Sequence, residues 1–469
     1  MMRRTTKAGL AVTAALCAVA ALPGTATAEP GDLPGYRTAD DAEARKGTAS
    51  SADGPRLAKD GTYSDKLAPG EKKYYSVELD AKSGAWLSAV AQPEAGSKVA
   101  FNDGLTVTLE GTDGTKCDSS EVTFGSDGTA RPLSATAGRT VTPDGDCQDP
   151  GVYNVSVERA GEATSDPSAW PLELRFMQEP PVRGSVPTTP PEREDLPTEP
   201  PEAPTGEPKR IKGGTGFNDA AGMAEGVWKD RLKPGETRFY RVPVDWGQQL
   251  VMSAEFGTTQ AAETSSYTSD GVRVDLYNPA RGHVDGEGAM YRADEPAAVP
   301  LAAATVDYVN RFAYDDPTSQ TGFAGWYYVS VHAKAEMGEF VDGSVPVTLR
   351  TTLTGKPQPG PSYEGDAAKA GFGVSGEDKE QAADGATADQ AGQDEGDHQL
   401  LAYGGIGAGT VLLLVLVVWT LTARRRPQIA DAVPYAGPPG GYVPQPVPPH
   451  GYGPPQQPYQ QGRPDGDWG

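Results

Sequence analysis

The sequence predicts an all-β chain that contains two tandem antiparallel β-sandwich domains. The first observation behind this prediction is a repeated phrase: DKLAPGEKKYYSVELD begins at Asp65, and DRLKPGETRFYRVPVD begins at Asp230. The second is a period of two in the apolar residues of many short segments. The third is the lack of a convincing amphipathic helix in the repeated regions. Together these features are typical of two similar β domains in series.

The repeated phrase is the first of several segments that recur in the same order. Its two copies lie 165 residues apart, since 230 − 65 = 165. Ordered recurrence of this kind indicates the duplication of a whole domain. The further pairs are WLSA at Trp86 with VMSA at Val251, GLTVTLEG at Gly104 with GVRVDLYN at Gly271, GVYNVSV at Gly151 with GWYYVSV at Gly325, and PLELR at Pro171 with PVTLR at Pro346.

Each repeated segment alternates between apolar and polar residues. In YYSVEL, Tyr75, Val77 and Leu79 share one face of the expected strand, and Tyr74 lies on the other face. Strands with one apolar and one polar face are typical of antiparallel sheets that pack face to face. The triplet PGE before this strand predicts a type II turn, because Pro fixes φ at the second position and Gly accepts positive φ at the third.

Composition divides the rest of the chain into segments that cannot bury a core, because they are polar or rich in Pro and Gly. A basic start, an apolar run and the small residues Ala26–Ala28 predict a signal peptide. The predicted organisation is a signal peptide at 1–28, a loose N-terminal segment at 29–60, a first sandwich at 61–177, a Pro-rich linker at 178–213, a second sandwich at 214–355, an acidic flexible stalk at 356–399, a transmembrane helix at 400–423, and a disordered Pro/Gly/Tyr/Gln-rich cytoplasmic tail at 424–469.

The segment 400–423 contains no charged residue and is long enough to cross a hydrocarbon core as a helix. Three arginines follow it as a stop-transfer signal, so the positive-inside rule places the tail in the cytoplasm and the N-terminal ectodomain outside the cell membrane. Gly405 and Gly409 form a G-x-x-x-G motif, which permits a helix-mediated dimer but is also frequent in membrane helices. The stop-transfer residues are Arg424, Arg425 and Arg426.

Charge and motifs restrict the chemistry that the chain can perform. The formal net charge is −23, which argues against nucleic acid as a partner, because phosphate binding needs clustered Lys and Arg. No H-E-x-x-H, G-x-S-x-G or P-loop motif occurs. His332 follows the face opposite the apolar residues of its strand, so we expect it to be exposed. We therefore expect a non-enzymatic protein without a cofactor, although a missing motif does not exclude an enzyme.

Cys117 and Cys147 are the two cysteines of the predicted mature chain, and both lie in the first repeat. Outside the cell we expect them to form a structural disulfide, since the C-x-x-C spacing of a redox pair is absent. Acidic residues flank both positions, and such hard oxygen ligands suit calcium. Acidic loops are common in a chain this acidic, so a calcium site and solvated loop charge both stay open. The acidic residues are Asp113, Asp118, Asp144, Asp146 and Asp149.

Three aromatic residues fall on the outward faces of the predicted strands: Tyr74, Phe239 and Tyr328. An exposed aromatic face can stack on sugars or anchor a protein partner. Alternatively, loops or the Pro-rich linker cover these rings. Both interpretations stay open, and the three residues are the candidate ligand-binding aromatics.

The order of these motifs resembles the bacterial pre-peptidase C-terminal domain family. The second repeat carries LKPGETRFY (Leu232–Tyr240), VDLYNP (Val274–Pro279) and GWYYVSV (Gly325–Val331), whereas the first departs from the family pattern at VTLEGTDG (Val107–Gly114). The resemblance implies β-sandwiches that act as binding or accessory modules, and some family members bind collagen, polysaccharide or calcium. No peptidase domain accompanies the repeats. No ligand-binding residue is carried over, because the matched positions are turn and core residues.

The sequence thus predicts a single-pass envelope protein whose paired extracellular sandwiches bind a cell-wall polymer or an envelope protein. The alternative is a membrane assembly or signalling component that works through its transmembrane helix and Pro-rich tail. The residues do not identify the ligand or the oligomeric state.

Overall fold

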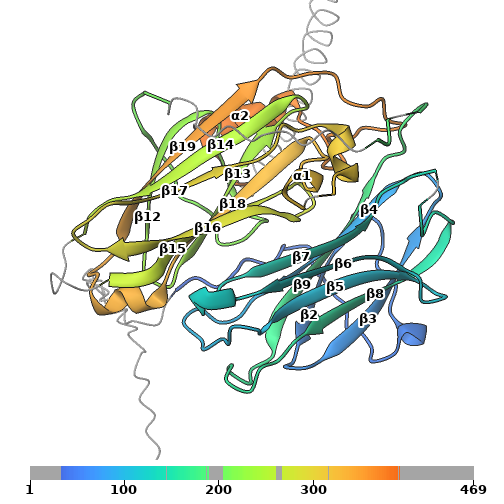
Figure 1. Ribbon diagram of the computed structural model, residues 1–469, viewed down its shortest axis with the longest axis horizontal. Coiled ribbons are helices and arrows are strands. Elements are labelled where there is room, and N and C mark those ends of the chain that lie inside the picture. Colours follow the sequence, from blue (N-terminus) through green and yellow to red (C-terminus); the bar gives the residue numbers. More distant parts are fainter. Residues whose placement is uncertain are drawn as a thin grey trace, which may run out of the picture. The chain divides into compact units, whose positions relative to one another are not determined.

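The computed structural model describes residues 33–143, 145–185, 187–189, 204–259, 267–314, 316–388 and 390. All of these residues belong to one of the two compact units of the chain, Met1–Gln399. They form four β-sheets with a few short helices between the strands (Figure 1). The prediction of all-β sandwiches is confirmed for this part of the chain.

The first sandwich consists of a five-stranded and a four-stranded sheet. Its strand pairs are antiparallel except for the short parallel pair β1 and β2. Two 3-10 helices, η1 (Ser51–Asp53) and η2 (Gly125–Asp127), lie in its loops. The five-stranded sheet has the order β1 (Glu43–Ala44), β2 (Thr62–Leu67), β9 (Trp170–Glu179), β4 (Gly84–Ala91) and β7 (Leu133–Arg139). The four-stranded sheet has the order β3 (Lys72–Leu79), β8 (Gly151–Arg159), β5 (Gly104–Gly111) and β6 (Lys116–Thr123).

The second sandwich consists of two five-stranded sheets. Its described loops hold η3 (Tyr308–Phe312), α1 (Asp316–Ser319) and η4 (Ala335–Glu339). One sheet has the order β10 (Lys209–Arg210), β12 (Gly226–Leu232), β19 (Val345–Gly355), β14 (Gln248–Phe256) and β17 (Ala297–Ala302). The other has the order β11 (Ala221–Gly222), β13 (Thr237–Val244), β18 (Gly325–Ala333), β15 (Tyr267–Tyr277) and β16 (His283–Arg292).

The two sandwiches share one topology. The order β1-β2-β9-β4-β7 matches β10-β12-β19-β14-β17 strand by strand, and β3-β8-β5-β6 matches β13-β18-β15-β16. The short strand β11, which pairs with β13 at Tyr240 and Arg241, corresponds in the first sandwich to a single parallel bridge between Arg56 and Ser76. The structure therefore has the arrangement that duplication of a whole domain predicts.

Alternation of apolar residues builds the core of each sandwich. On β3, Tyr75, Val77 and Leu79 are all at most 1% exposed and belong to the first core. The corresponding residues of β13, Tyr240 and Val242, are fully buried in the second core. These side chains point between the two sheets of their sandwich, as the period of two predicts.

The triplet PGE forms the predicted turn in both sandwiches. Glu71 donates its backbone N–H to the carbonyl of Ala68 at 3.1 Å, and Gly70 has a φ of 67°. In the second copy Gly235 has a φ of 83°. Positive φ at the third turn position is what a type II turn requires, so glycine is needed there.

The repeated phrase also contains a polar contact that the sequence did not reveal. The Asp65 carboxylate accepts a hydrogen bond from the Tyr75 hydroxyl at 2.8 Å, and Asp230 accepts one from Tyr240 at 2.8 Å. Each carboxylate also accepts a backbone N–H from upstream, which comes from Gly47 for Asp65 at 2.9 Å. Gly213 makes the same contact with Asp230 at 2.8 Å. The segment before the repeated phrase is therefore part of each domain.

The expectation of a loose segment at 29–60 is wrong for its described part, 33–60. β1 pairs with β2, and Leu57 is 1% exposed in the first core. Thr48 and Arg56 make isolated β-bridges to β3. The physical reason is that Asp65 needs the Gly47 N–H donor and the core needs the Leu57 side chain.

The expectation of a flexible stalk at 356–399 is wrong for 356–388. Tyr363 makes a β-bridge to Val182, and α2 (Gly376–Asp384) packs against β11 and β13. Phe372 is fully buried. We call residues 356–388 the strap. Composition suggested flexibility because the strap is polar, but the buried Phe372 and the half-buried Tyr363 fix it to the body.

Several predicted features lie outside the described residues: the signal peptide 1–28, positions 186 and 190–203 of the Pro-rich linker, the membrane segment 400–423 with Gly405 and Gly409, the stop-transfer residues Arg424–Arg426 and the tail. Within the described ranges, no helix is long and apolar enough to span a membrane.

Candidate functional site

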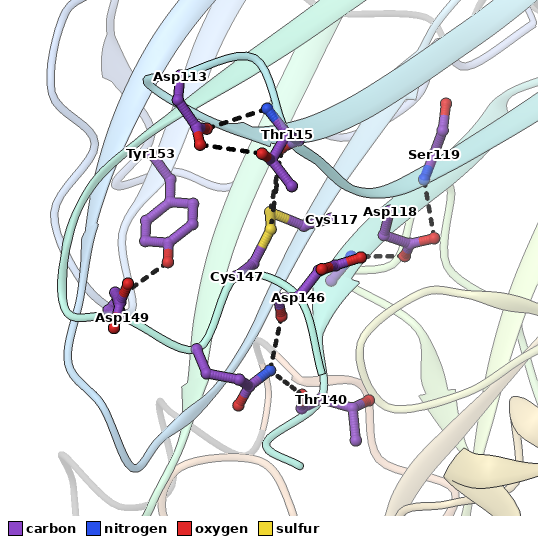
Figure 2. The surroundings of a disulfide bond; sticks show 12 residues. Asp113, Thr115, Cys117, Asp118, Ser119, Thr140, Asp146, Cys147, Asp149 and Tyr153 are labelled. Atoms are coloured by element: carbon purple, nitrogen blue, oxygen red, sulfur yellow. Dashed lines mark hydrogen bonds between the residues drawn. A yellow bond between two sulfur atoms is a disulfide. The ribbon is translucent and has the colours of Figure 1, made fainter. Parts of the chain in front are cut away.

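The disulfide predicted for the first sandwich is present. Cys117 on β6 and Cys147 in the loop before β8 are joined, with their Cα atoms 5.7 Å apart (Figure 2). The bond closes a loop whose ends are 30 residues apart. Chain-entropy reasoning assigns such a loop about 3.5 kcal/mol of stabilisation. The bond therefore fixes the loop before β8 to the edge strand β6.

The Asp113 and Asp118 carboxylates near the disulfide accept hydrogen bonds from neighbouring groups of the first sandwich. Asp113 accepts hydrogen bonds from the backbone N–H and the hydroxyl of Thr115, both at 3.0 Å, and these bonds lower the pKa of Asp113 (Figure 2). Asp118 accepts backbone N–H groups from Ser119 and Gly138, both at 2.8 Å.

The other two described aspartates make their hydrogen bonds through the backbone: the carbonyl of Asp146 accepts from Gln148, and that of Asp149 from Tyr153. Asp144 lies outside the described residues. In the part of the chain that the structure describes, no group of His, Cys, Asp or Glu residues is arranged to hold a metal ion. The geometry thus offers no support for calcium at this loop.

The predicted aromatic face of the second sandwich is present but covered. Phe239 is 1% exposed and Tyr328 is 8% exposed, so of the two open interpretations the one in which the rings are covered holds for both. They pack with Phe217, Tyr277 and Val90, and Val90 belongs to β4 of the first sandwich. Phe217 is the centre of the cluster, 5.0 Å from the Phe239 ring and 5.2 Å from the Tyr328 ring. The partner that these rings anchor is the chain's own first domain.

Tyr74, the third predicted aromatic, has a different environment. It lies on β3 of the first sandwich and is half-buried, with the ammonium group of Lys72 5.6 Å from its ring. Of the three candidates, only Tyr74 keeps an accessible ring. The structure therefore does not bring the three predicted aromatics together.

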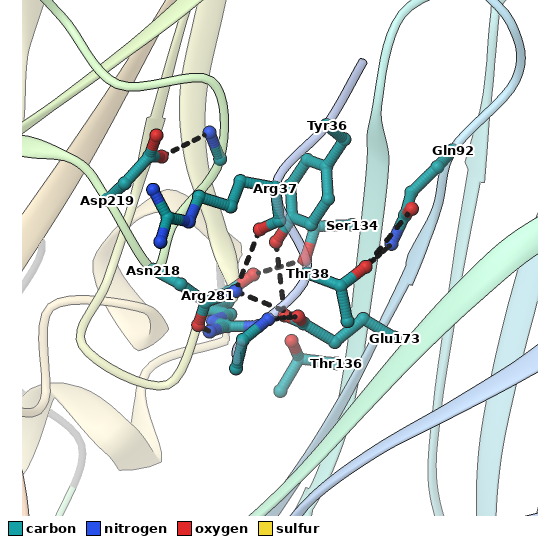
Figure 3. Close-up of polar contacts among 12 residues, drawn as sticks. Tyr36, Arg37, Thr38, Gln92, Ser134, Thr136, Glu173, Asn218, Asp219 and Arg281 are labelled. Atoms are coloured by element: carbon teal, nitrogen blue, oxygen red, sulfur yellow. Dashed lines mark hydrogen bonds and ion pairs between the residues drawn. The ribbon is translucent and has the colours of Figure 1, made fainter. Parts of the chain in front are cut away.

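A network of buried polar groups joins the two sandwiches around Glu173 (Figure 3). Glu173 on β9 is fully buried and forms an ion pair with Arg281 of the second sandwich at 2.5 Å. It also accepts hydrogen bonds from Asn218 at 2.8 Å, from the Ala39 N–H at 2.8 Å and from the Tyr36 hydroxyl at 3.1 Å. The carboxylate thus has four donors from three separate segments. We call this contact between the two sandwiches the seam.

The Glu173 carboxylate raises the pKa of the groups that contact it. Burial alone lowers the pKa of Arg281, but the adjacent Glu173 carboxylate outweighs this effect and the pKa is raised. Burial, followed by the charge of Glu173, raises the pKa of Tyr36. Arg281 has a φ of 67°, which lies in the left-handed region. This strained backbone conformation is typical of a residue whose side chain is held by its surroundings, here by Glu173 and Asn218.

A second buried ion pair connects the far end of β9 with the second sandwich. Glu179 accepts two hydrogen bonds from Arg311, at 2.7 and 3.0 Å. The hydroxyl of Tyr363, which belongs to the strap, donates to the same carboxylate at 2.7 Å. The guanidinium of Arg311 also lies 3.6 Å from the ring centre of Tyr308. A two-pronged Arg–carboxylate contact fixes orientation as well as distance.

The strap packs against both sandwiches at one place. Phe372 clusters with Met177 from β9 and with Phe323 from the second sandwich. The α2 helix of the strap begins with a capping box of Ser375 and Asp378, and Asp378 also accepts the Trp326 indole N–H at 2.7 Å. The strap therefore stabilises the position of one sandwich against the other.

His332 illustrates how the seam changes the environment of a strand position. The expectation that it is exposed is wrong, since it is 3% exposed. Its Nδ1 atom lies 2.8 Å from the Thr237 hydroxyl, and its Nε2 atom is buried without a hydrogen-bond partner among the described residues. Burial, assisted by the positive charge of Arg131 from the first sandwich, lowers the pKa of His332 to about 3.

The residues that build the seam were not recognised from the sequence. Glu173 occupies the outward position of an alternating strand, so it was expected in water, and the same holds for the charged residues of the second sandwich. A comparison of the repeats contains one signal: the position of Glu173 in PLELR corresponds to Thr348 in PVTLR. On the second repeat, Tyr277 and Tyr328 also stand at outward positions where the first repeat has Glu110 and Asn154. Such differences mark faces with different surroundings.

Comparisons with known proteins find weak likeness to solved structures. No protein-family model matches the chain, and no curated protein matches it. Among solved structures, the pre-peptidase C-terminal domain of a collagenase from Bacillus anthracis is 15% identical, with 26% of this chain and 94% of that chain covered and a TM-score of 0.18. The tandem CBM22-1-CBM22-2 domain of Xyn10C from Paenibacillus barcinonensis is 13% identical, with 70% and 99% covered and a TM-score of 0.17. Tripeptidyl peptidase 2 is 8% identical, with 64% and 24% covered and a TM-score of 0.19. Scores this low carry no argument about function.

Proposed function

We propose that the chain is a non-enzymatic, single-pass protein of the cell envelope whose two sandwiches act outside the membrane as one interaction module. The observation that carries this proposal is the Cys117–Cys147 disulfide. Structural disulfides persist in oxidising compartments outside the cytosol. The signal peptide and stop-transfer helix that the sequence predicts agree with that location.

The seam supports the idea of one module rather than two tethered domains. Buried ion pairs at Glu173 and Glu179 and the aromatic cluster around Phe217 join the sandwiches. A partner would therefore meet a fixed pair of domains. We propose a cell-wall polymer or an envelope protein as that partner, and we propose that each sandwich is of the pre-peptidase C-terminal type, on the repeated motifs alone.

The strap favours a second candidate function, membrane assembly or signalling through the transmembrane helix and the Pro-rich tail. The chain that leads to residue 400 is packed against both sandwiches through Phe372 and α2. A rearrangement of the sandwiches would then displace the strap, which ends at residue 388, twelve positions before the predicted membrane segment begins. This candidate predicts that deletion of 427–469 abolishes function while partner binding persists.

Affinity capture tests the first proposal. The full chain is inserted in lipid nanodiscs and incubated with wall-polymer and envelope-protein fractions, with the heat-unfolded chain as the control. We expect selective enrichment of one class on the folded chain. Equal recovery on folded and unfolded chain would refute the binding role, and turnover of a wall polymer by the folded chain would refute the non-enzymatic assignment.

A further inference from the structure

A basic hollow lies close to the end of the described chain. It has a volume of about 550 Å³ and is lined by four cationic side chains from three segments of the chain: Arg37, Arg210, Lys212 and Arg238. The chain has 64 acidic and 41 basic residues, yet the described lining of this hollow has four cations and a single acid, Asp219. The composition of this hollow is therefore unlike that of the whole chain.

Two of these cations are already neutralised by neighbours. Arg37 pairs with Asp40 at 2.8 Å, and Arg238 pairs with Glu236 at 2.5 Å. Asp219 is held within its own loop, where it accepts the backbone N–H groups of Thr215 and Gly216.

The other two cations are available. Arg210 and Lys212 are exposed, and neither has an ion-pair partner among the described residues. They flank Ile211, which is 8% exposed, and the Ile211 N–H donates to the Lys229 carbonyl at 3.0 Å. Both cations are thus carried on backbone that is fixed to the sheet of β12. No ion pair with a described residue neutralises these two charges, which line the hollow.

The hollow is also close in sequence to the predicted membrane segment. Gln390 lines it, and Leu400 begins that segment ten residues later. Even a fully extended chain covers this separation in at most about 35 Å. The intervening chain carries Asp394, Glu395 and Asp397, so it cannot itself attract an anionic surface. Any such attraction has to come from the body.

We propose that the basic hollow binds the phosphate of anionic lipid headgroups in the membrane that carries the chain. This inference rests on the proposed membrane anchor. Cations close to an anionic bilayer surface are each attracted by about 1 kcal/mol, a factor of about five in occupancy. Arg210 and Lys212 supply the free charge, and the paired Arg37 and Arg238 line the wall. Contact at this face would hold the two sandwiches at a fixed orientation to the membrane.

Chemical labelling of lysine amines on the inserted full chain tests the proposal. The chain is placed in nanodiscs of phosphatidylcholine alone or of phosphatidylcholine mixed with phosphatidylglycerol, and the labelling rate of each lysine is followed by mass spectrometry. We expect Lys212 to label about fivefold more slowly in the anionic discs, with the difference lost at high salt. Lys59, an exposed lysine of the first sandwich, serves as the internal control and should label equally in both.

Two variants separate the hollow from general charge effects. Arg210→Glu should remove the protection of Lys212, whereas Lys66→Glu, at an exposed lysine of the first sandwich, should leave it intact. Equal labelling of Lys212 in both lipids by an inserted chain would overturn the proposal. Equal protection by inorganic phosphate added to phosphatidylcholine discs would overturn the assignment to lipid. A chain that fails to insert, as judged by extraction with carbonate, would refute the membrane anchor instead.

Discussion

The sheet β3-β8-β5-β6 of the first sandwich and the sheet β13-β18-β15-β16 of the second have the same topology but different outer faces. At one equivalent pair of positions, Tyr74 is half-buried and Phe239 is 1% exposed. At another, Glu158 is exposed and pairs with Lys72, whereas His332 is 3% exposed. The first face keeps exposed positions such as Glu158, whereas the second is the docking surface of the seam. Duplication explains why the fold occurs twice. Side chains on the outer face of the sheet β13-β18-β15-β16 join the two copies through the seam.

The largest effect on stability is expected when the Glu173 carboxylate at the centre of the seam is removed. Glu173→Ala leaves the buried Arg281 guanidinium and three other donors without their acceptor, so we expect a loss of about 4 kcal/mol in the free energy of unfolding. Thr348→Ala changes the equivalent position of the second sandwich, which is only half-buried, and should cost far less. Calorimetric unfolding measures both. Equal losses in the two variants would show that the Glu173 network contributes no more to stability than the equivalent half-buried position.

The disulfide gives the next largest difference, because it is present in one copy only. Replacing both Cys117 and Cys147 by Ser should cost about 3.5 kcal/mol. Hydrogen exchange should locate the effect in the first sandwich, around β6 and β8, with the amides of β14 and β19 much less changed. A loss of protection spread evenly over both sandwiches would mean that the seam transmits the change, and it would weaken the distinction between the two copies.

The aromatic face can be tested by paired substitutions at one equivalent position. Phe239→Ala opens a cavity in the cluster around Phe217 and should destabilise the chain by about 3 kcal/mol. Tyr74→Ala removes a half-exposed ring and should cost about 0.5 kcal/mol. Denaturant unfolding of both variants checks the difference. If Tyr74→Ala were as costly as Phe239→Ala, the outer face of the first sandwich would also have to be a packed surface.

The sequence was sufficient to predict the fold class because turns and strands have signals that lie within short segments. A turn at PGE and a period of two in Tyr75, Val77 and Leu79 specify a strand with a buried face, and the repeat specifies that it occurs twice. The disulfide also followed from compartment and cysteine count.

The seam could not be predicted in the same way, because period two describes only which residues share a face and not what that face meets. Glu173, Arg281 and His332 have the same pattern whether water or another domain covers them. The strap was hidden for a related reason: its composition is polar, and Phe372 alone gives little sign of a buried contact. Only the differences between the copies carried this information.

The smallest expected effect concerns pH and the buried His332. Its pKa is lowered to about 3 by burial, with further lowering from Arg131, Arg273 and Lys334 and an opposing effect of Asp275. Between this value and the usual histidine value near 6.5, the unfolded chain binds a proton that the folded chain does not. Stability from this residue is therefore present above about pH 6.5 and is lost as the pH falls toward 3, with a slope of up to about 1.4 kcal/mol per pH unit.

The measurement compares unfolding free energies of His332→Asn and the unmodified chain across this range. The carboxylates that the two share cancel in the difference, so the variant should lose less stability on acidification. A pH dependence unchanged by His332→Asn would mean that this position is as accessible as its counterpart Glu158. The difference between the two outer faces would then have to rest on the aromatic residues alone.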